Sequence, residues 1–218
     1  EGLQPQCIKD GVEHGATCKG VHWGGTSHAT LCDKNVLKMM RSAGCSHLVY
    51  GYESFSHQVL KRLGKGSTPE TNFRSFHWTM EAGIRPIPNQ IIGFPTEDFD
   101  SLRDSMNMWK RLGIIVKPFF ATPYPGSAWF TIYRDRILEQ YGGDLDAFMA
   151  DLGDATDITA VISENFNAVE LYGLREMMVR FDYDRIAEYE RDWKKRHPKA
   201  DAIRAAEERE ERHRVVLA

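Results

Sequence analysis

The sequence predicts an α/β fold, in which helices cover a mainly parallel β-sheet. Two observations lead to this prediction. Short apolar runs typical of buried strands alternate with longer segments in which apolar residues recur at three- to four-residue steps, as in amphipathic helices. The links between the two kinds of segment are short, which is typical of strand–helix–strand units. Periodicity alone leaves open whether the sheet is an open, doubly wound sheet or a barrel.

Glycines indicate where three predicted helices end and where the next strands begin. Gly44, Gly83 and Gly113 each follow a helical segment and precede an apolar run. Glycine is favoured just after a helix because the backbone there often adopts the left-handed conformation. With an additional strand predicted at 19–25, the sequence indicates four strands.

The predicted helices have recognisable first residues. Asp33, Thr68 and Thr96 are residue types that cap helix N-termini, and a proline follows Thr68 at the first helical position. A further short helix is predicted after the second strand. Beyond about residue 128 the pattern indicates helices only, so we expect a β/α region over 1–127 and a helical C-terminal region over 128–218.

Composition and charge exclude several classes of protein. The formal net charge is only −3, which gives no indication of a nucleic-acid partner. No apolar run approaches the roughly 18 residues of a transmembrane helix, and the N-terminal stretch does not have the pattern of a signal peptide. A cytoplasmic protein without a transmembrane segment is therefore expected. The four cysteines are too widely spaced for a CxxC metal site, and ordinary thiols are expected.

Polar residues gather where the predicted strands end. The four strand exits read "WGGTSHA", "GYES", "GFPTED" and "TPYPGS". Because ligands bind at the carboxyl ends of parallel strands, these exits are expected to surround one pocket. Glu53 and Ser54 would lie at its rim, although Ser54 could equally cap the next helix. A carboxylate above a buried strand needs a donor, such as a sugar hydroxyl or an ammonium group.

Residues 23–127 resemble the radical S-adenosylmethionine (SAM) enzymes, especially the branch that carries a cobalamin-binding domain before the radical core. The resemblance depends on an ordered set of motifs: "GYES" followed by "VLKRLGKGST", then "IIGFPTED", then "TPYPGS". It implies a partial (β/α)6 TIM-like barrel, to which this chain contributes strands three to six, followed by an all-helical C-terminal region.

The resemblance also implies which residues bind SAM on two of the strands. Glu53, with Ser54 beside it at the rim, occupies the polar position at the end of the fourth barrel strand, where relatives contact the ribose or the methionine moiety. Lys65 matches a basic position that can pair with the methionyl carboxylate. Thr26 or His28, after the third barrel strand, would complete the polar wall, but many relatives carry Arg at the position of His28.

On the fifth barrel strand the resemblance assigns three residues that alternate toward one face. Asn89 would approach the ribose, and Ile91 and Gly93 would line the adenine.

The CxxxCxxC motif that binds a 4Fe–4S cluster in the family is absent from this chain. We expect that motif upstream of Glu1, together with the first two strands and any cobalamin-binding domain. The cofactors that the resemblance implies are thus SAM, a 4Fe–4S cluster whose ligands lie outside this chain and, as an open alternative, cobalamin.

The function expected from this resemblance is part of a radical SAM enzyme that acts on a small-molecule or peptide substrate. The reaction would be a cobalamin-dependent methyl transfer or a related carbon–carbon bond-forming or ring-forming step. The alternative is a non-catalytic remnant of the barrel that serves as a binding module. A barrel without its first strands leaves one strand edge unpaired. We therefore expect that residues 1–18 or the C-terminal helices cover this edge, or that the isolated chain is only marginally stable.

Overall fold

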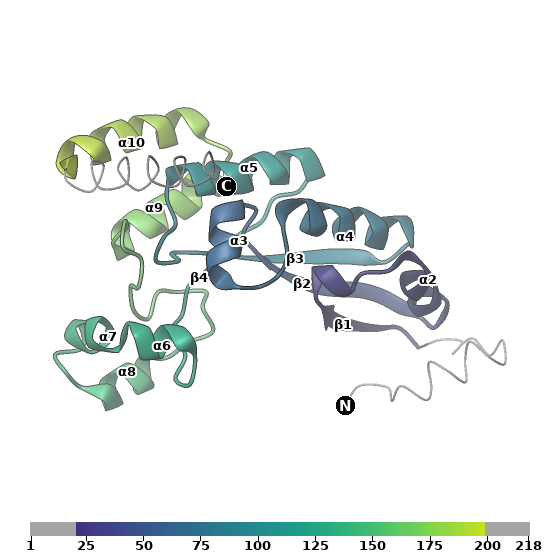
Figure 1. The fold of residues 1–218 in the computed structure, drawn as a ribbon, viewed down its shortest axis with the longest axis horizontal. Coiled ribbons are helices and arrows are strands. Elements are labelled where there is room, and N and C mark those ends of the chain that lie inside the picture. Colours follow the sequence, from purple (N-terminus) through teal and green to yellow (C-terminus); the bar gives the residue numbers. More distant parts are fainter. Residues whose placement is uncertain (1–20, 199–218) are drawn as a thin grey trace, which may run out of the picture.

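The computed structural model describes residues 21–198 and shows a parallel sheet with helices on one side (Figure 1). The strands are β1 (Trp23–Ser27), β2 (Cys45–Glu53), β3 (Arg85–Ile92) and β4 (Phe119–Phe120). The helices are η1 (Ala29–Leu31, a 3-10 turn), α2 (Lys34–Ser42), α3 (His57–Leu63), α4 (Pro69–Glu81), α5 (Phe99–Leu112), α6 (Ala128–Ile132), α7 (Arg134–Gln140), α8 (Leu145–Asp151), α9 (Ala168–Val179) and α10 (Tyr183–Arg196).

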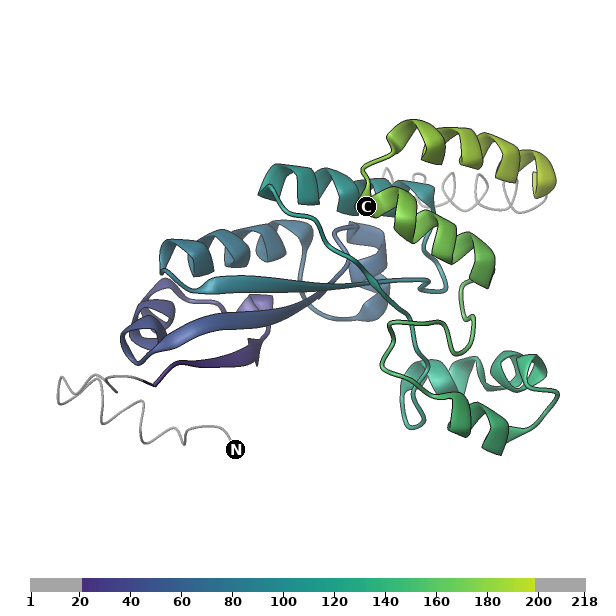
Figure 2. The ribbon, with the colours of Figure 1, turned by 180° about the vertical axis from the view of Figure 1, so that it is seen from behind.

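The strands lie in sequence order β1-β2-β3-β4, and every neighbouring pair is parallel. The sheet curls and twists, as the view from behind shows (Figure 2), and it has the form of part of a barrel. The predicted fold class, a partial barrel of parallel strands with helices outside, is therefore confirmed. Because all strands point the same way, their carboxyl ends meet at one edge.

Alternation along β2 decides which residues face the helices. The buried rings of Tyr50 and Tyr52 lie against α4, where their hydroxyl groups bond to Thr79 Oγ1 at 2.8 Å and Ser75 Oγ at 2.9 Å. Their alternate neighbours, including Glu53, are only half-buried. These neighbours must point to the opposite, concave face, because successive side chains of a strand point to opposite faces.

Two of the three predicted helix starts are confirmed. The Asp33 carboxylate accepts from two backbone N–H groups at the start of α2, and the Thr68 hydroxyl accepts from Thr71 N at the start of α4. Thr96 was the wrong prediction for α5, whose cap is Asp98. The reason is a reciprocal pair: Asp98 Oδ1 accepts from Ser101 N at 2.8 Å, and Ser101 Oγ accepts from Asp98 N at 2.8 Å.

The first and last strands differ from their predicted bounds. The described part of the first strand runs from Trp23 to Ser27, later than 19–25. The last strand shortens to two residues, and Pro118, which lacks the N–H group that a ladder needs, stands immediately before it.

The described residues after 127 contain helices α6 to α10. Helices α9 and α10 pack against α5 around Phe99, whose ring centroid lies 5.0 Å from that of Phe166 and 5.8 Å from that of Trp193. Helices α6 to α8 surround a smaller apolar cluster that includes Ile137 and Phe148.

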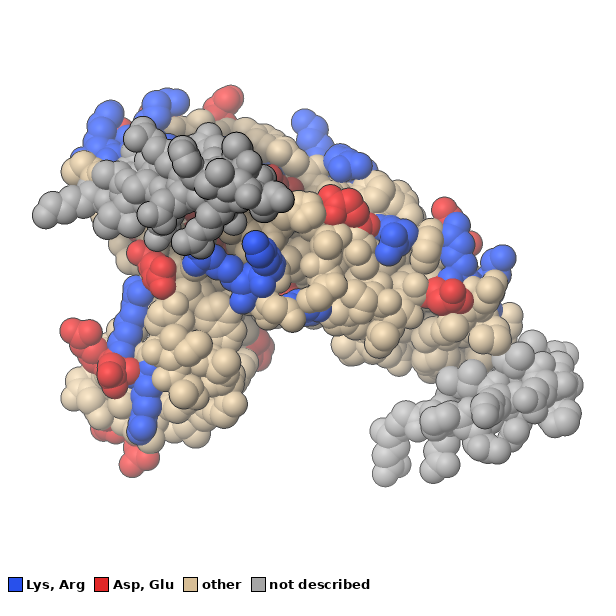
Figure 3. Space-filling model, viewed as in Figure 1, with Lys and Arg blue, Asp and Glu red and all other residues tan. Residues whose placement is uncertain are grey.

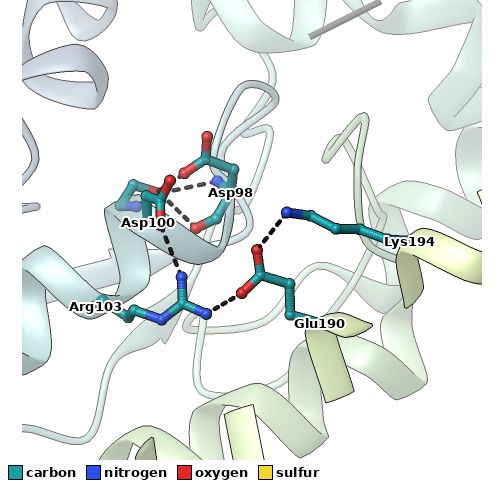
Figure 4. Close-up of polar contacts among 6 residues, drawn as sticks. Asp98, Asp100, Arg103, Glu190 and Lys194 are labelled. Carbon is teal, nitrogen blue, oxygen red and sulfur yellow. Dashed lines mark hydrogen bonds and ion pairs between the residues drawn. The ribbon is translucent and has the colours of Figure 1, made fainter. Parts of the chain in front are cut away.

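An ion-pair network joins α10 to α5 (Figure 4). The Arg103 guanidinium donates to Asp100 on its own helix and to Glu190 on α10, and Lys194 Nζ lies 2.9 Å from the other oxygen of Glu190. Helix α10 thus lies over α5. The described C-terminal helices do not cover the free edge of β1. Residues 1–18 lie outside the described residues, and the marginal stability of the isolated chain stays a prediction.

Charged side chains of both signs are interspersed over the face of the molecule shown in Figure 3. Within residues 21–198, no helix is both long enough and apolar enough to cross a lipid bilayer.

Candidate functional site

A cavity of about 270 Å³ lies where β2 and β3 end. It is lined by Glu53, Leu63, Lys65, Ile91, Phe94 and Trp129. Three of these, Glu53, Lys65 and Ile91, were among the residues predicted for the site. The wall therefore combines one ion pair with apolar and aromatic side chains, which suits a ligand that is polar at one end and flat and apolar at the other.

Glu53 adopts an unusual backbone conformation at the end of β2. Its φ is 60°, in the left-handed region that residues with a Cβ seldom adopt. The register with β3 also shifts between Gly51 and Glu53, so β2 ends in an irregularity. Such strain is found most often at functional sites, where the surrounding structure maintains it.

The Glu53 carboxylate pairs directly with the Lys65 ammonium group, twelve residues further on. About a fifth of each side chain is exposed, so the pair faces the cavity without being immersed in solvent. A lysine ammonium group has three donors, so Lys65 can bind Glu53 and still donate to an anionic group of a ligand. The carboxylate retains acceptor positions for hydroxyl groups.

Gly51 provides the space for this ion pair. A Cβ atom on Gly51 would lie 2.7 Å from Glu53 Oε1 and 2.9 Å from Lys65 Nζ, both closer than normal contact. The absence of a side chain two residues before the strand ends is therefore a requirement of the site. This glycine is part of the motif "GYES", but no pattern in the sequence distinguished it from other glycines.

Glu97 is a second carboxylate that sequence reasoning missed. It is fully buried in the turn after β3, and its Oε2 accepts a hydrogen bond of 2.6 Å from Gly93 N. Burial raises the pKa of Glu97 to about 8, against the effect of the N–H groups of Gly93 and Phe94, which lower it. Glu97 thereby fixes the turn that carries Phe94 into the cavity. Its only signal in the sequence was its place in "GFPTED".

The other predicted residues of β3 lie near the cavity without lining it. Asn89 is half-buried and pairs in register with Gly51, so it lies beside the ion pair on the neighbouring strand. Gly93 has φ 92°, and a Cβ there would lie 3.1 Å from Leu171 Cδ1, so this glycine allows α9 to approach the turn.

Three predicted residues lie apart from the cavity. Ser54 is buried; its Oγ accepts from Ser56 N, and its carbonyl accepts from Asn72 Nδ2. Ser54 therefore belongs to the turn between β2 and α3, and it does not cap α3, which is preceded by Ser56. Thr26 is exposed, and His28 Nδ1 accepts from Thr30 N at the start of η1.

A second hollow of about 480 Å³ lies among the C-terminal helices. Its lining includes Arg136, whose guanidinium donates to the carbonyl of Ser163, and Glu164, which accepts from the Tyr133 hydroxyl at 2.9 Å. Both charged groups are thus engaged within the protein. Within the described residues, no group of three or more His, Cys, Asp or Glu side chains is arranged to bind a metal ion.

Comparison with known proteins finds a match to one family. Residues 6–108, just under half of the chain, match the model of the radical SAM superfamily. This part of the chain is therefore similar to the radical SAM superfamily.

Individual relatives match the same part of the chain. An uncharacterised methyltransferase of Pyrococcus horikoshii is 32% identical over 108 residues, which is 49% of this chain and 24% of the relative. The anaerobic magnesium-protoporphyrin IX monomethyl ester cyclase of Rubrivivax gelatinosus is 27% identical over 121 residues, which is 54% of this chain and 22% of the relative. The chain thus spans less than a quarter of the length of these relatives.

Among solved structures, the radical SAM methyltransferase TsrM of Kitasatospora setae, with tryptophan and a SAM analogue bound, has a TM-score of 0.48 at 17% identity. The match covers 63% of this chain and 26% of TsrM.

Proposed function

We propose that this chain provides the SAM-binding edge of a radical SAM enzyme. The observation that carries the proposal is the Glu53–Lys65 ion pair, which faces a cavity at the carboxyl ends of parallel strands in a radical SAM domain. Lys65 would donate to the methionyl carboxylate of SAM, and Glu53 would accept from its ribose hydroxyl groups or its ammonium group. Ile91 would contact the adenine, with Asn89 beside the ribose.

The residues that line the cavity fit the parts of SAM. An ammonium group complements a carboxylate, a carboxylate complements hydroxyl groups, and apolar side chains complement a purine. Thr26, His28, Ser54 and Gly93 were also predicted to bind SAM. Of these, Gly93 lies beside the cavity, whereas Thr26, His28 and Ser54 lie apart from it, and the Ser54 side chain is engaged in the turn. Their part in binding SAM stays a prediction.

The reaction proposed for the whole protein would need a 4Fe–4S cluster, which would supply the electron for the cleavage of SAM. Three cysteines in a CxxxCxxC motif, which residues 1–218 do not contain, would hold it. We propose a cobalamin-dependent methyl transfer or a carbon–carbon bond-forming or ring-forming reaction on a small molecule or peptide. The names of the Pyrococcus methyltransferase and the Rubrivivax cyclase support these two reaction classes.

Substitution of Glu53 tests the proposal. We expect Glu53→Gln to weaken SAM binding by the 218-residue chain at least tenfold, measured by isothermal titration calorimetry. The control is Glu81→Gln, because Glu81 also pairs with a lysine, Lys34, but lies exposed on α4 away from the cavity. Equal affinities of wild type and Glu53→Gln for SAM would contradict the proposed site.

A further inference from the structure

Trp129 lines the cavity although it lies outside the residues that match the radical SAM domain. It belongs to α6, in the helical region, whereas the family match ends at residue 108. Its neighbours in the lining include Glu53 at the end of β2, Lys65 in the link after α3 and Phe94 in the turn after β3. The helical region therefore contributes a wall to the candidate SAM site.

Two other aromatic rings pack against the ring of Trp129. Its centroid lies 5.8 Å from that of Phe94 in a tilted arrangement, and 6.1 Å from that of Tyr133 in a nearly parallel stack. The Tyr133 hydroxyl donates to Glu164 Oε1, which fixes the second ring. Trp129 is thus preorganised to present an aromatic surface to the cavity, so that a ligand does not have to order it.

The cavity has one polar and one aromatic part. Glu53 and Lys65 form the polar part, and Phe94 and Trp129 form the aromatic part. If the ion pair takes the ribose and the methionyl group, the purine has to lie in the remaining space, against the aromatic side chains. Tryptophan offers the largest flat surface of any side chain for stacking on a heteroaromatic ring.

We infer that Trp129 stacks on the adenine of the bound SAM and so contributes to the affinity for adenosyl ligands. This inference rests on the proposed function, because it presumes that the cavity binds SAM. It adds a binding residue from the helical region.

The test compares two ligands that share the adenosyl group. S-adenosylhomocysteine carries a carboxylate, and 5′-methylthioadenosine does not. When an aromatic side chain that stacks on a base is replaced by alanine, the affinity typically falls by roughly 5- to 150-fold. We therefore expect Trp129→Ala to lower the affinity for both ligands by the same factor, at least fivefold. The affinities of Trp129→Phe should stay within about threefold of those of wild type. A substitution of Lys65, in contrast, should lower the affinity only for the ligand with the carboxylate.

Trp78→Ala is the matched control, because Trp78 lies on α4 against Lys34 and Arg74 and does not line the cavity. If Trp129→Ala does not fold, nuclear Overhauser contacts between the adenine H2 proton and the Trp129 indole in the wild-type chain replace it. If wild type binds the ligands and Trp129→Ala has the same affinity for them, the inference is overturned while the proposed function stands. The same holds if wild type binds the ligands without those nuclear Overhauser contacts. Absence of binding by wild type overturns the proposed function as well.

Discussion

Glu53 is the residue at which backbone strain and charge coincide. The φ of Glu53 is 60°, and this conformation destabilises a residue with a Cβ by about 1 kcal/mol or more, a strain that glycine does not have. Its side chain and that of Lys65 are partly exposed, so their ion pair adds about 0–1 kcal/mol of stability. The strain and the ion pair nearly cancel in the free energy of unfolding. A contribution to stability therefore does not explain why a glutamate occupies position 53.

Substitution of Glu53 by glycine separates stability from binding. We expect Glu53→Gly to have a free energy of unfolding within about 1 kcal/mol of wild type, because strain and ion pair are removed together. Its affinity for SAM should fall at least tenfold. Urea denaturation and calorimetry measure the two quantities.

Ala155 provides the control, since it is a second residue with positive φ, at 67°, and lies in a loop outside the cavity lining. Ala155→Gly should raise stability by about 0.5–1 kcal/mol without changing affinity. A Glu53→Gly protein that still bound SAM like wild type would show that the carboxylate has no part in binding.

Gly51 and Gly25 form a matched pair on neighbouring strands. A Cβ on Gly51 would collide with the Glu53 and Lys65 side chains, whereas a Cβ on Gly25 would make an ordinary contact of 3.9 Å with Leu48. The atoms that Gly51→Ala displaces are the ends of flexible side chains, so the fold should tolerate it. We expect Gly51→Ala to weaken SAM binding about tenfold, with Gly25→Ala near wild type, by calorimetry. Equal affinities of the two variants would show that the ion-pair geometry does not matter.

At the scale of elements, the turn between β3 and α5 depends on the protonation of Glu97. Burial raises its pKa to about 8, whereas a glutamate in an unfolded chain titrates near 4.5. Between these two values the folded state binds more protons than the unfolded state, so stability falls as pH rises. The stability contributed by neutral Glu97 is fully present below about pH 4.5, and it is lost as the pH rises from there through about 8.

Denaturation at several pH values tests this dependence. Between pH 5 and pH 8 the free energy of unfolding of wild type should fall by up to about 1.4 kcal/mol per pH unit from this group. Glu97→Gln keeps an oxygen for Gly93 N and cannot ionise, so its profile should be flatter over that range. If the variant and wild type had parallel profiles, Glu97 would not be the titrating group.

The attachment of α10 to α5 depends on a second set of charges. Although burial opposes it, pairing with Arg103 and Lys194 lowers the pKa of Glu190. The side chain of Glu190 is 15% exposed, and that of Arg103 is 25% exposed. Removal of Glu190 would leave the partly buried Arg103 with only the exposed Asp100 as a partner, which costs more than the loss of an exposed pair.

We therefore expect Glu190→Gln to lower the free energy of unfolding by about 1–2 kcal/mol. Glu176→Gln, on α9, removes an exposed ion pair with Arg180, whose atoms are 4.0 Å apart. This substitution should change the free energy of unfolding by less than about 0.5 kcal/mol. Urea denaturation distinguishes the two, and a similar small change in both would show that the network does not attach α10.

At the scale of the whole molecule, local sequence signals predicted the parallel sheet and the residues that converge on its edge. Glu53 could be predicted because it lies where an apolar strand ends, whereas Lys65 was predicted from the resemblance to the radical SAM enzymes. Asp98 and Thr96 are both good capping residues, and only the pairing of Asp98 with Ser101 decides between them. Trp129 and Glu97 could not be predicted, because their roles depend on tertiary packing that periodicity does not report.

The central claim, that the Glu53–Lys65 pair binds SAM, is tested most directly by the affinity of a Lys65 variant for two ligands. Calorimetry would compare wild type, Lys65→Met and the surface control Lys34→Met with S-adenosylhomocysteine and 5′-methylthioadenosine. We expect Lys65→Met to weaken binding of only the ligand with the carboxylate, at least tenfold, and Lys34→Met to change neither affinity. Equal affinity of wild type and Lys65→Met for S-adenosylhomocysteine would contradict it.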